Sequence, residues 1–389
     1  MNSLQVCVNT LKAYGATESE IEELLTYNQN VFSRPMLGHL HRTQSEPHLA
    51  TWEQYTQDAA ALGTYVTLQT YLVQLQFPII AGISETPDYR AATRQGKSTK
   101  SMKNATGLIL QQPEHLKLYI HQTLAGEIPV LVAPNRHDFI ALVQALVKKN
   151  EPWPVPDAMG ACTVQGYNNW HRVHQYQAKW LAENQDHQRD WGSEFQRLTQ
   201  HPELYRDRFI LLSYGVYSHV TANKLGLEEQ KWLELSFKIR LEHECTHYVT
   251  QRWFNSMRNN ILDELIADYR GIVKAIGNYR SDWFLHFVGL EAFPSYRLGG
   301  RLENYRGQPE LSPGAFKILQ QLVKTAAENL EKFDQKIEHS QRTEIAETAI
   351  FIALTTFRLE ELASQQGVEL LETAVEQQKE LMINSQLNV

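Results

Sequence analysis

The spacing of apolar and polar positions predicts helices and short strands in the first part of the chain. Apolar residues that recur at every third or fourth position are typical of an amphipathic helix, and short apolar runs bounded by turn residues are typical of a strand. By these criteria we expect two helices, two strands and a helix capped by Asn135, at residues 18–27, 48–75, 77–83, 128–133 and 135–150. This succession predicts an α/β N-terminal lobe.

The second part of the chain has the pattern of a mainly helical lobe. We expect one strand and then four helices, at residues 208–217, 227–254, 261–277, 312 onward and 343–365. Gly277 is expected to end the second of these helices, and Ser312 with Pro313 is typical of the N-cap and first turn of the third. The two lobes together predict an α+β fold.

Two segments lack a periodic apolar pattern. Residues 151–160 (EPWPVPDAMG) contain three prolines, which remove backbone donors and restrict the residues before them. We interpret this segment as a linker between an N-terminal domain, residues 1–151, and a second domain, residues 157–389. Residues 88–107 carry five basic side chains and few apolar ones, which predicts an exposed loop, with anion binding as the alternative.

The composition is that of a globular protein and gives no reason to expect a nucleic-acid or membrane partner. Hydrophobic residues make up 42% of the 389 residues, charged residues 21%, and the net charge is −7. A net negative charge gives no broad attraction to nucleic acid or to an anionic membrane surface. No apolar stretch approaches the roughly 18 residues of a membrane helix. We therefore expect neither a nucleic-acid nor a membrane partner.

Cysteine usage and the first residues predict a cytoplasmic protein. The three cysteines, Cys7, Cys162 and Cys245, are scattered and have no CxxC spacing, which argues against a disulfide framework and against a cysteine zinc cluster. The first residues lack the basic and then apolar regions of an export signal. Both features are typical of a protein that stays in a reducing compartment.

A metal-ligand spacing occurs at residues 243–247 (HECTH). Each helical residue turns about 100°, so His243 and His247 lie about 40° apart and one turn along the axis, where both imidazoles can face one ion. Glu244 lies to one side of the helix face that carries the two histidines, where its carboxylate can reach a metal-bound water molecule rather than the ion itself. Glu242 is aimed further away. The alternative is an ordinary polar face of a helix.

The next predicted helix supplies a third ligand. Two imidazoles leave a catalytic zinc site underfilled, because such a site usually has three protein ligands and a water molecule. Glu264 and Asp268 lie four residues apart beside an apolar stripe. We expect Glu264 to bind the metal and Asp268 to accept the N–H of a ligating histidine. Asp263 points about 100° away from Glu264 and is the weaker candidate.

These two segments together resemble a known signature. HECTH at 243–247 followed by ELIAD at 264–268 resembles the HExxH plus ExxxD motif of gluzincin-type zinc metallopeptidases, the thermolysin-like clan. The resemblance implies a zincin-like C-terminal lobe in which His243, His247 and Glu264 bind Zn²⁺. It also implies that Glu244 is the general base and that Asp268 supports a histidine.

The expected chemistry is zinc-dependent hydrolysis of a peptide or amide substrate. Zinc lowers the pKa of a bound water molecule to about 7, and Glu244 would accept its proton and deliver it to the leaving amine. The developing negative oxygen requires a further donor. Residues 295–305 (SYRLGGRLENY) offer Tyr296, Arg301 and Tyr305 for this role, with a surface turn as the alternative.

Several alternatives remain open at this point. The strand at 208–217 either binds an extended peptide at the edge of a sheet or is a buried strand. His171 and His174 have metal-ligand spacing but no acidic neighbour, so a surface helix is expected there. The alternative functions are amide hydrolysis or tailoring of a small metabolite, and a binding protein that retains the motif without turnover.

Overall fold

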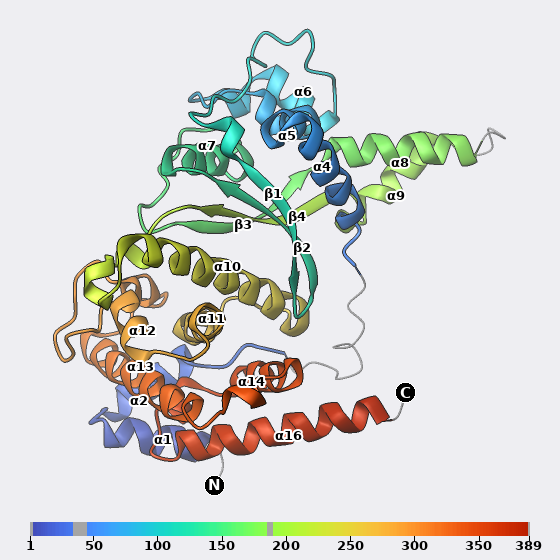
Figure 1. The fold of residues 1–389 in the computed structure, drawn as a ribbon. Coiled ribbons are helices and arrows are strands. Elements are labelled where there is room, and N and C mark those ends of the chain that lie inside the picture. The colour runs from blue at the N-terminus through green and yellow to red at the C-terminus, as the bar shows by residue number, and fades with distance from the viewer. Residues whose placement is uncertain (1–2, 34–44, 185–189, 388–389) are drawn as a thin grey trace. The chain divides into compact units, whose positions relative to one another are not determined.

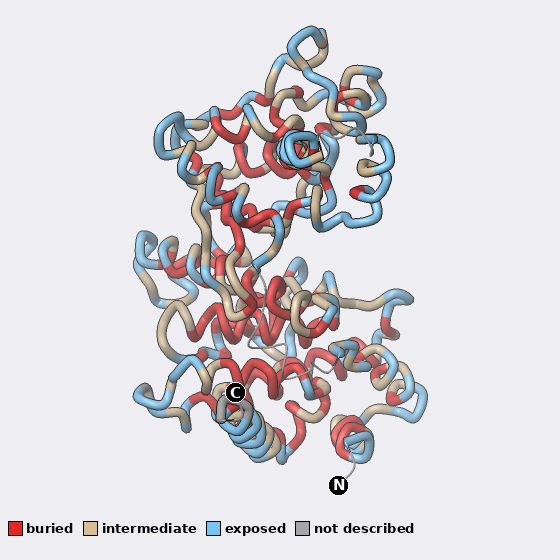
Figure 2. Tube along the Cα trace, turned by 90° about the vertical axis from the view of Figure 1, so that its right-hand side faces the viewer, coloured by how far each residue is buried: buried red, intermediate tan, exposed pale blue. Residues whose placement is uncertain are grey.

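The computed structural model describes residues 3–33, 45–184 and 190–387 (Figure 1). Contacts divide the chain into two compact units. We call residues 1–43 with 216–389 the helical unit, and residues 44–215 the sheet unit. Each unit has its own buried interior (Figure 2). The sheet lies in the sheet unit and helices occur in both, so the fold is α+β, as predicted.

This division differs from the domain boundary predicted at the proline-rich segment 151–160. That segment lies inside the sheet unit, where it connects helix α7 (Arg136–Leu146) to strand β3 (Ala161–Asn168). Arg136 fixes it by donating hydrogen bonds to the backbone carbonyl groups of Val155 and Pro156, at 3.3 and 2.6 Å. Proline content predicted an irregular segment but not its place within one unit.

The sheet has four strands in the order β1-β2-β4-β3. Their bounds are Lys117–Thr123, Gly126–Ala133, Arg206–Ser213 for β4 and Ala161–Asn168 for β3. β1 and β2 are antiparallel, β2 and β4 are parallel, and β3 and β4 are antiparallel. β4 is therefore paired on both sides and contributes buried Phe209 and Leu211 to the core. The expected buried strand at 208–217 is confirmed over Arg206–Ser213, and its alternative as an edge strand for a peptide is wrong.

The helices of the sheet unit only partly follow the predicted pattern. Their bounds are Leu49–Leu62 (α4), Thr64–Tyr71 (α5), Pro87–Gln95 (α6), Arg136–Leu146 (α7), Trp170–Glu183 (α8) and Trp191–Thr199 (α9). Asn135 caps α7 by accepting a hydrogen bond from the Asp138 N–H at 2.9 Å, as predicted. The single helix predicted over 48–75 is divided at Gly63, whose φ of +87° interrupts the helix. The strand predicted within 77–83 is absent, and α6 occupies part of the predicted loop 88–107.

The helical unit contains the long helices of the chain. Their bounds are Ser3–Ala13 (α1), Glu18–Tyr27 (α2), Glu229–Phe254 (α10), Asn260–Ile276 (α11), Ser281–Val288 (α12), Pro313–Asp334 (α13), Glu344–Thr356 (α14), Leu359–Leu362 (α15) and Gly367–Leu387 (α16). Ser312 caps α13 and Gly277 ends α11 with a φ of +85°, as predicted. The helix predicted over 343–365 is divided, because Phe357 and Arg358 have extended backbone. Across the described residues, none of the helices has the length and apolar character needed to cross a membrane.

Glu360 is a fully buried carboxyl group in α15. Burial raises its pKa from the usual 4.5 to about 7, although Asn28 donates a hydrogen bond to Oε1 at 2.8 Å. The folded state therefore binds this proton more tightly than the unfolded state. The stabilisation is complete below pH 4.5 and is lost as the pH rises through 7. At about 1.4 kcal/mol for each pKa unit, the loss approaches roughly 3 kcal/mol.

We predict that Glu360→Gln removes this fall in the free energy of unfolding between pH 5 and 8. Glutamine retains the acceptor for Asn28 and does not titrate, so the change is expected in the slope against pH. Urea unfolding across this range measures it. Glu369→Gln, at an exposed position of α16, is the control and should keep the wild-type slope. An unchanged slope in Glu360→Gln would contradict the assignment.

Candidate metal centre

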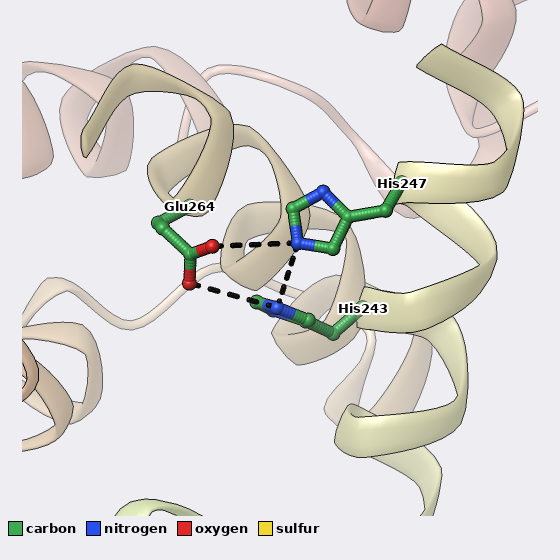
Figure 3. Close-up of side chains that lie close together, drawn as sticks. All are labelled: His243, His247 and Glu264. Atoms are coloured by element: carbon green, nitrogen blue, oxygen red, sulfur yellow. Dashed lines mark hydrogen bonds and ion pairs between the residues drawn. The ribbon is translucent and has the colours of Figure 1, made fainter. Parts of the chain in front are cut away.

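Two neighbouring helices bring three side chains with metal-binding atoms together (Figure 3). His243 and His247 project from successive turns of α10, and Glu264 reaches toward them from α11. Gly271 of α11 permits the close approach of the two helices, because an added Cβ there would lie 2.8 Å from the carbonyl oxygen of Ile239 in α10. The glycine lowers the intrinsic helix propensity of α11 but allows this packing.

The separations within this group match the geometry of a zinc site. The Nε2 atoms of His243 and His247 are 3.1 Å apart, and the Glu264 carboxylate lies 3.6 Å from the first and 3.4 Å from the second. Two ligands of a tetrahedral zinc ion, each bonded at about 2.1 Å, are separated by about 3.4 Å. The three residues are 6%, 7% and 8% exposed. Their nitrogen and oxygen donors fit a zinc ion in both type and spacing.

Asp268 fixes the orientation of His243. Its Oδ1 atom lies 2.7 Å from His243 Nδ1, and the carboxylate is fully buried in α11. A carboxylate at this distance accepts the Nδ1–H, which leaves the lone pair of Nε2 available for a metal. The structure thus brings together all four residues of the predicted ligand and support set.

Asp263 has the corresponding position beside His247. Its Oδ2 atom lies 3.7 Å from His247 Nδ1, beyond hydrogen-bonding distance. Both carboxylate oxygens and Nδ1 are buried, and none has a hydrogen-bond partner among the described residues. Sequence reasoning gave Asp263 little weight because it was compared with the direction of Glu264. Its position relative to His247 is the relevant one.

Tyr217 joins the same network and was missed by the sequence analysis. Its hydroxyl donates to Asp268 Oδ1 at 2.7 Å and lies 2.9 Å from His243 Nδ1. Arg301 donates to this hydroxyl at 2.9 Å and forms an ion pair with the other oxygen of Asp268. The Arg301 Nε atom also lies 3.5 Å from Glu264. Tyr217 and Arg301 therefore hold the carboxylate of Asp268 in place, and Arg301 also lies beside the carboxylate of Glu264.

Opposite charges outweigh burial in this cluster. Burial alone would raise the pKa values of Glu264 and Asp268, but Arg301 and His243 hold both below their usual values. Burial alone would lower the pKa of His247, but Asp263 and Glu264 raise it well above its usual value. The carboxylates that favour a proton on His247 equally favour a metal cation. The site is electrostatically suited to bind positive charge.

Glu244 and the residues of the 295–305 segment have different environments. Glu244 is half-buried on α10 and makes no hydrogen bond or ion pair within the described ranges. Tyr305 lies near Glu264, and burial together with this carboxylate raises the pKa of its hydroxyl. Tyr296 instead donates to the Gly300 carbonyl at 3.0 Å and packs its ring edge-on against Phe316. The contacts of Tyr296 are those of a packing residue and do not join it to the histidines.

Comparisons with known proteins give one finding. The profile of a family of unknown function (DUF7005) matches residues 9–366. No curated protein and no solved structure matches the chain. No reaction comes from these comparisons, so function has to be argued from the geometry of the cluster.

Proposed function

Since the chain belongs to a family of unknown function, we propose its reaction from the site: it is a zinc-dependent hydrolase that cleaves a peptide bond. The observation that carries this proposal is the convergence of His243, His247 and Glu264 within 4.8 Å of one another. Two imidazoles and one carboxylate are a ligand set of catalytic zinc sites and leave a position open for water or substrate. The resemblance of residues 243–268 to gluzincin-type peptidases supports the same reaction.

The residues of the chain have separate tasks in this reaction. His243, His247 and Glu264 would hold the zinc ion, which supplies an activated water at neutral pH and polarises the scissile carbonyl. The carboxylate of Glu244 accepts the proton of the attacking water and delivers it to the nitrogen of the leaving amine. Asp268 keeps the proton of His243 on Nδ1 throughout.

Tyr305 is the preferred donor to the oxygen that becomes negative. It lies near Glu264, and a tyrosine hydroxyl is protonated at neutral pH and can donate a hydrogen bond. Arg301 already donates to Tyr217 and Ser218 and pairs with Asp268, which suits a positioning residue better than a group that moves to substrate. Tyr296 has no part in this scheme.

We predict that the purified protein contains one equivalent of zinc and cleaves peptides from a mixed library. Removal of the metal with a chelator should abolish cleavage, and added zinc should restore it, because the water molecule is not activated without the ion. Elemental analysis and mass spectrometry of the products measure both. A protein that binds zinc but cleaves only small amides would transfer the proposal to metabolite hydrolysis. Failure to bind zinc at all would overturn it.

A further inference from the structure

The sheet unit contains a cavity that is separate in its residues from the metal cluster. It has a volume of about 790 Å³ and is lined by α5, by the end of α6 with the following loop, and by the start of α8. This volume falls within the range of roughly 300–1,000 Å³ that is common for small-molecule sites. Its lining includes Tyr71, Lys97, Lys100, Trp170, His171 and His174.

The lining of this cavity is positively charged. Lys97 and Lys100 contribute two ammonium groups, and His171 and His174 contribute two imidazoles, while no Asp or Glu is among the lining residues. Within the described ranges neither lysine forms an ion pair. Burial and, after it, the neighbouring His174 lower the pKa of His171, although Asp58 and Asp207 act in the opposite direction.

The loop that carries the lysines is held in place by the fold. Gly96 has a φ of +66° and lies on the indole of Trp170, where any Cβ would collide with the ring. Thr99 donates to the side chain of Gln76 at 2.6 Å, and the Gly107 N–H donates to the Gln76 carbonyl at 2.9 Å. The loop is therefore a fixed wall of the cavity, and the ordering cost of binding is reduced.

Aromatic and imidazole rings in fixed orientations form another part of the lining. His171 stacks on Tyr71 with ring centroids 4.2 Å apart, and its Nδ1 lies 2.9 Å from the Tyr55 hydroxyl. Trp170 donates its indole N–H to the Thr93 carbonyl at 2.7 Å. These contacts leave a polar, cationic region at the lysines and a partly apolar region at the rings.

We propose that this cavity binds an organic phosphate, with the phosphate at Lys97 and Lys100 and the organic part against Tyr71 and His171. A phosphate dianion matches two unpaired ammonium groups, and lysine is a common phosphate binder as a point charge. Ser98 and Thr99, from the same loop as the lysines, also line the cavity. The volume exceeds the need of inorganic phosphate alone.

Calorimetric titration of the full-length protein tests this proposal. The probes are AMP, glucose 6-phosphate, inorganic phosphate and adenosine. We expect at least one of the two organic phosphates to bind, to bind more tightly than inorganic phosphate and adenosine, and to weaken with added salt. The double variant K97Q/K100Q should lose at least tenfold in affinity for that ligand.

Matched variants make each outcome decisive. Lys103 lies on the same loop but does not line the cavity, so Lys103→Gln should bind as the wild type does. Equal binding by K97Q/K100Q and the wild type, or no binding of either organic phosphate by the wild type, would overturn the proposal. Adenosine binding as tightly as AMP would also overturn it. Glu264→Gln should leave phosphate binding unchanged, which separates this proposal from that of the metal centre.

Discussion

Replacing Glu244 by glutamine is expected to abolish peptide cleavage while the zinc ion stays bound. Glutamine has the size of glutamate but no basic carboxylate, so the proton of the attacking water has no acceptor. General base catalysis contributes roughly 10²–10⁴-fold, and we expect kcat/KM to fall by this factor. Glu244 is half-buried and has no hydrogen bond or ion pair in the described part of the chain, so the neutral amide should cost little stability. Steady-state kinetics and elemental analysis measure the two effects.

Glu242→Gln is the matched control for this variant. Glu242 lies two residues earlier on α10 and points further from the histidines, so the same chemical change should leave activity close to the wild-type value. Retained cleavage in Glu244→Gln would show that the carboxylate is not the base. A protein that only binds its partner predicts unchanged function in both variants, and the comparison therefore also tests that alternative.

Helices with a clear apolar stripe and recognisable ends could be predicted closely from the sequence. α2 has the predicted bounds, and α10 and α11 lie within two residues of theirs. α13 begins at the predicted cap. The Ser312 side chain accepts a hydrogen bond from the backbone N–H of Ala315, and Pro313 has no backbone N–H that would need a partner in the first turn. In each case local sequence and tertiary packing favour the same structure.

The segments that make up each unit could not be predicted, because they are joined by contacts between distant parts of the chain. Asn30 donates hydrogen bonds to the carbonyl groups of Thr355 and Phe357, more than 300 residues away along the chain. The periodic pattern of apolar residues does not indicate which distant residue a side chain contacts. The strand predicted within 77–83 is absent for a related reason: an apolar run does not show that a segment pairs with a strand, and in this segment Ile80 is exposed.

The metal cluster could be predicted as far as its residues follow helical spacing. His243 with His247, and Glu264 with Asp268, are each one turn apart, so the spacing itself orients them. Tyr217 precedes His243 by 26 residues and lies outside any helix that carries the motif, so only the folded chain reveals its contact. Arg301 was expected at the substrate, whereas the fold places it against Asp268 and Glu264. The sequence of the 295–305 segment did not distinguish the role of Arg301 from that of Tyr296. In an irregular segment, spacing along the chain does not determine which way each side chain points.

Substitution of Glu264 by alanine is expected to remove the zinc ion from the protein. The substitution deletes one of three ligands and leaves two imidazoles. Loss of a residue that only supports a ligand lowers metal affinity about 10–100-fold. Loss of a ligand itself should therefore lower zinc affinity by more than about a hundredfold. Zinc at 100 times the wild-type Kd stabilises the folded wild type by about 2.7 kcal/mol. For a variant with hundredfold weaker binding the same concentration gives only about 0.4 kcal/mol. Urea unfolding with and without zinc measures this difference.

Two further variants separate loss of the ligand from loss of the fold. Glu264→Gln keeps the volume of the buried side chain and a polar oxygen beside Arg301 Nε, which lies 3.5 Å from the Glu264 carboxylate, so it should fold and yet bind zinc far more weakly than the wild type. Glu234→Ala removes an exposed glutamate from α10 and should retain the full zinc-dependent stabilisation. A Glu264→Ala protein that folds and keeps one equivalent of zinc would contradict the three-ligand site. Because His243 and His247 would then hold the ion without α11, the pairing of the two helices would no longer explain the metal centre.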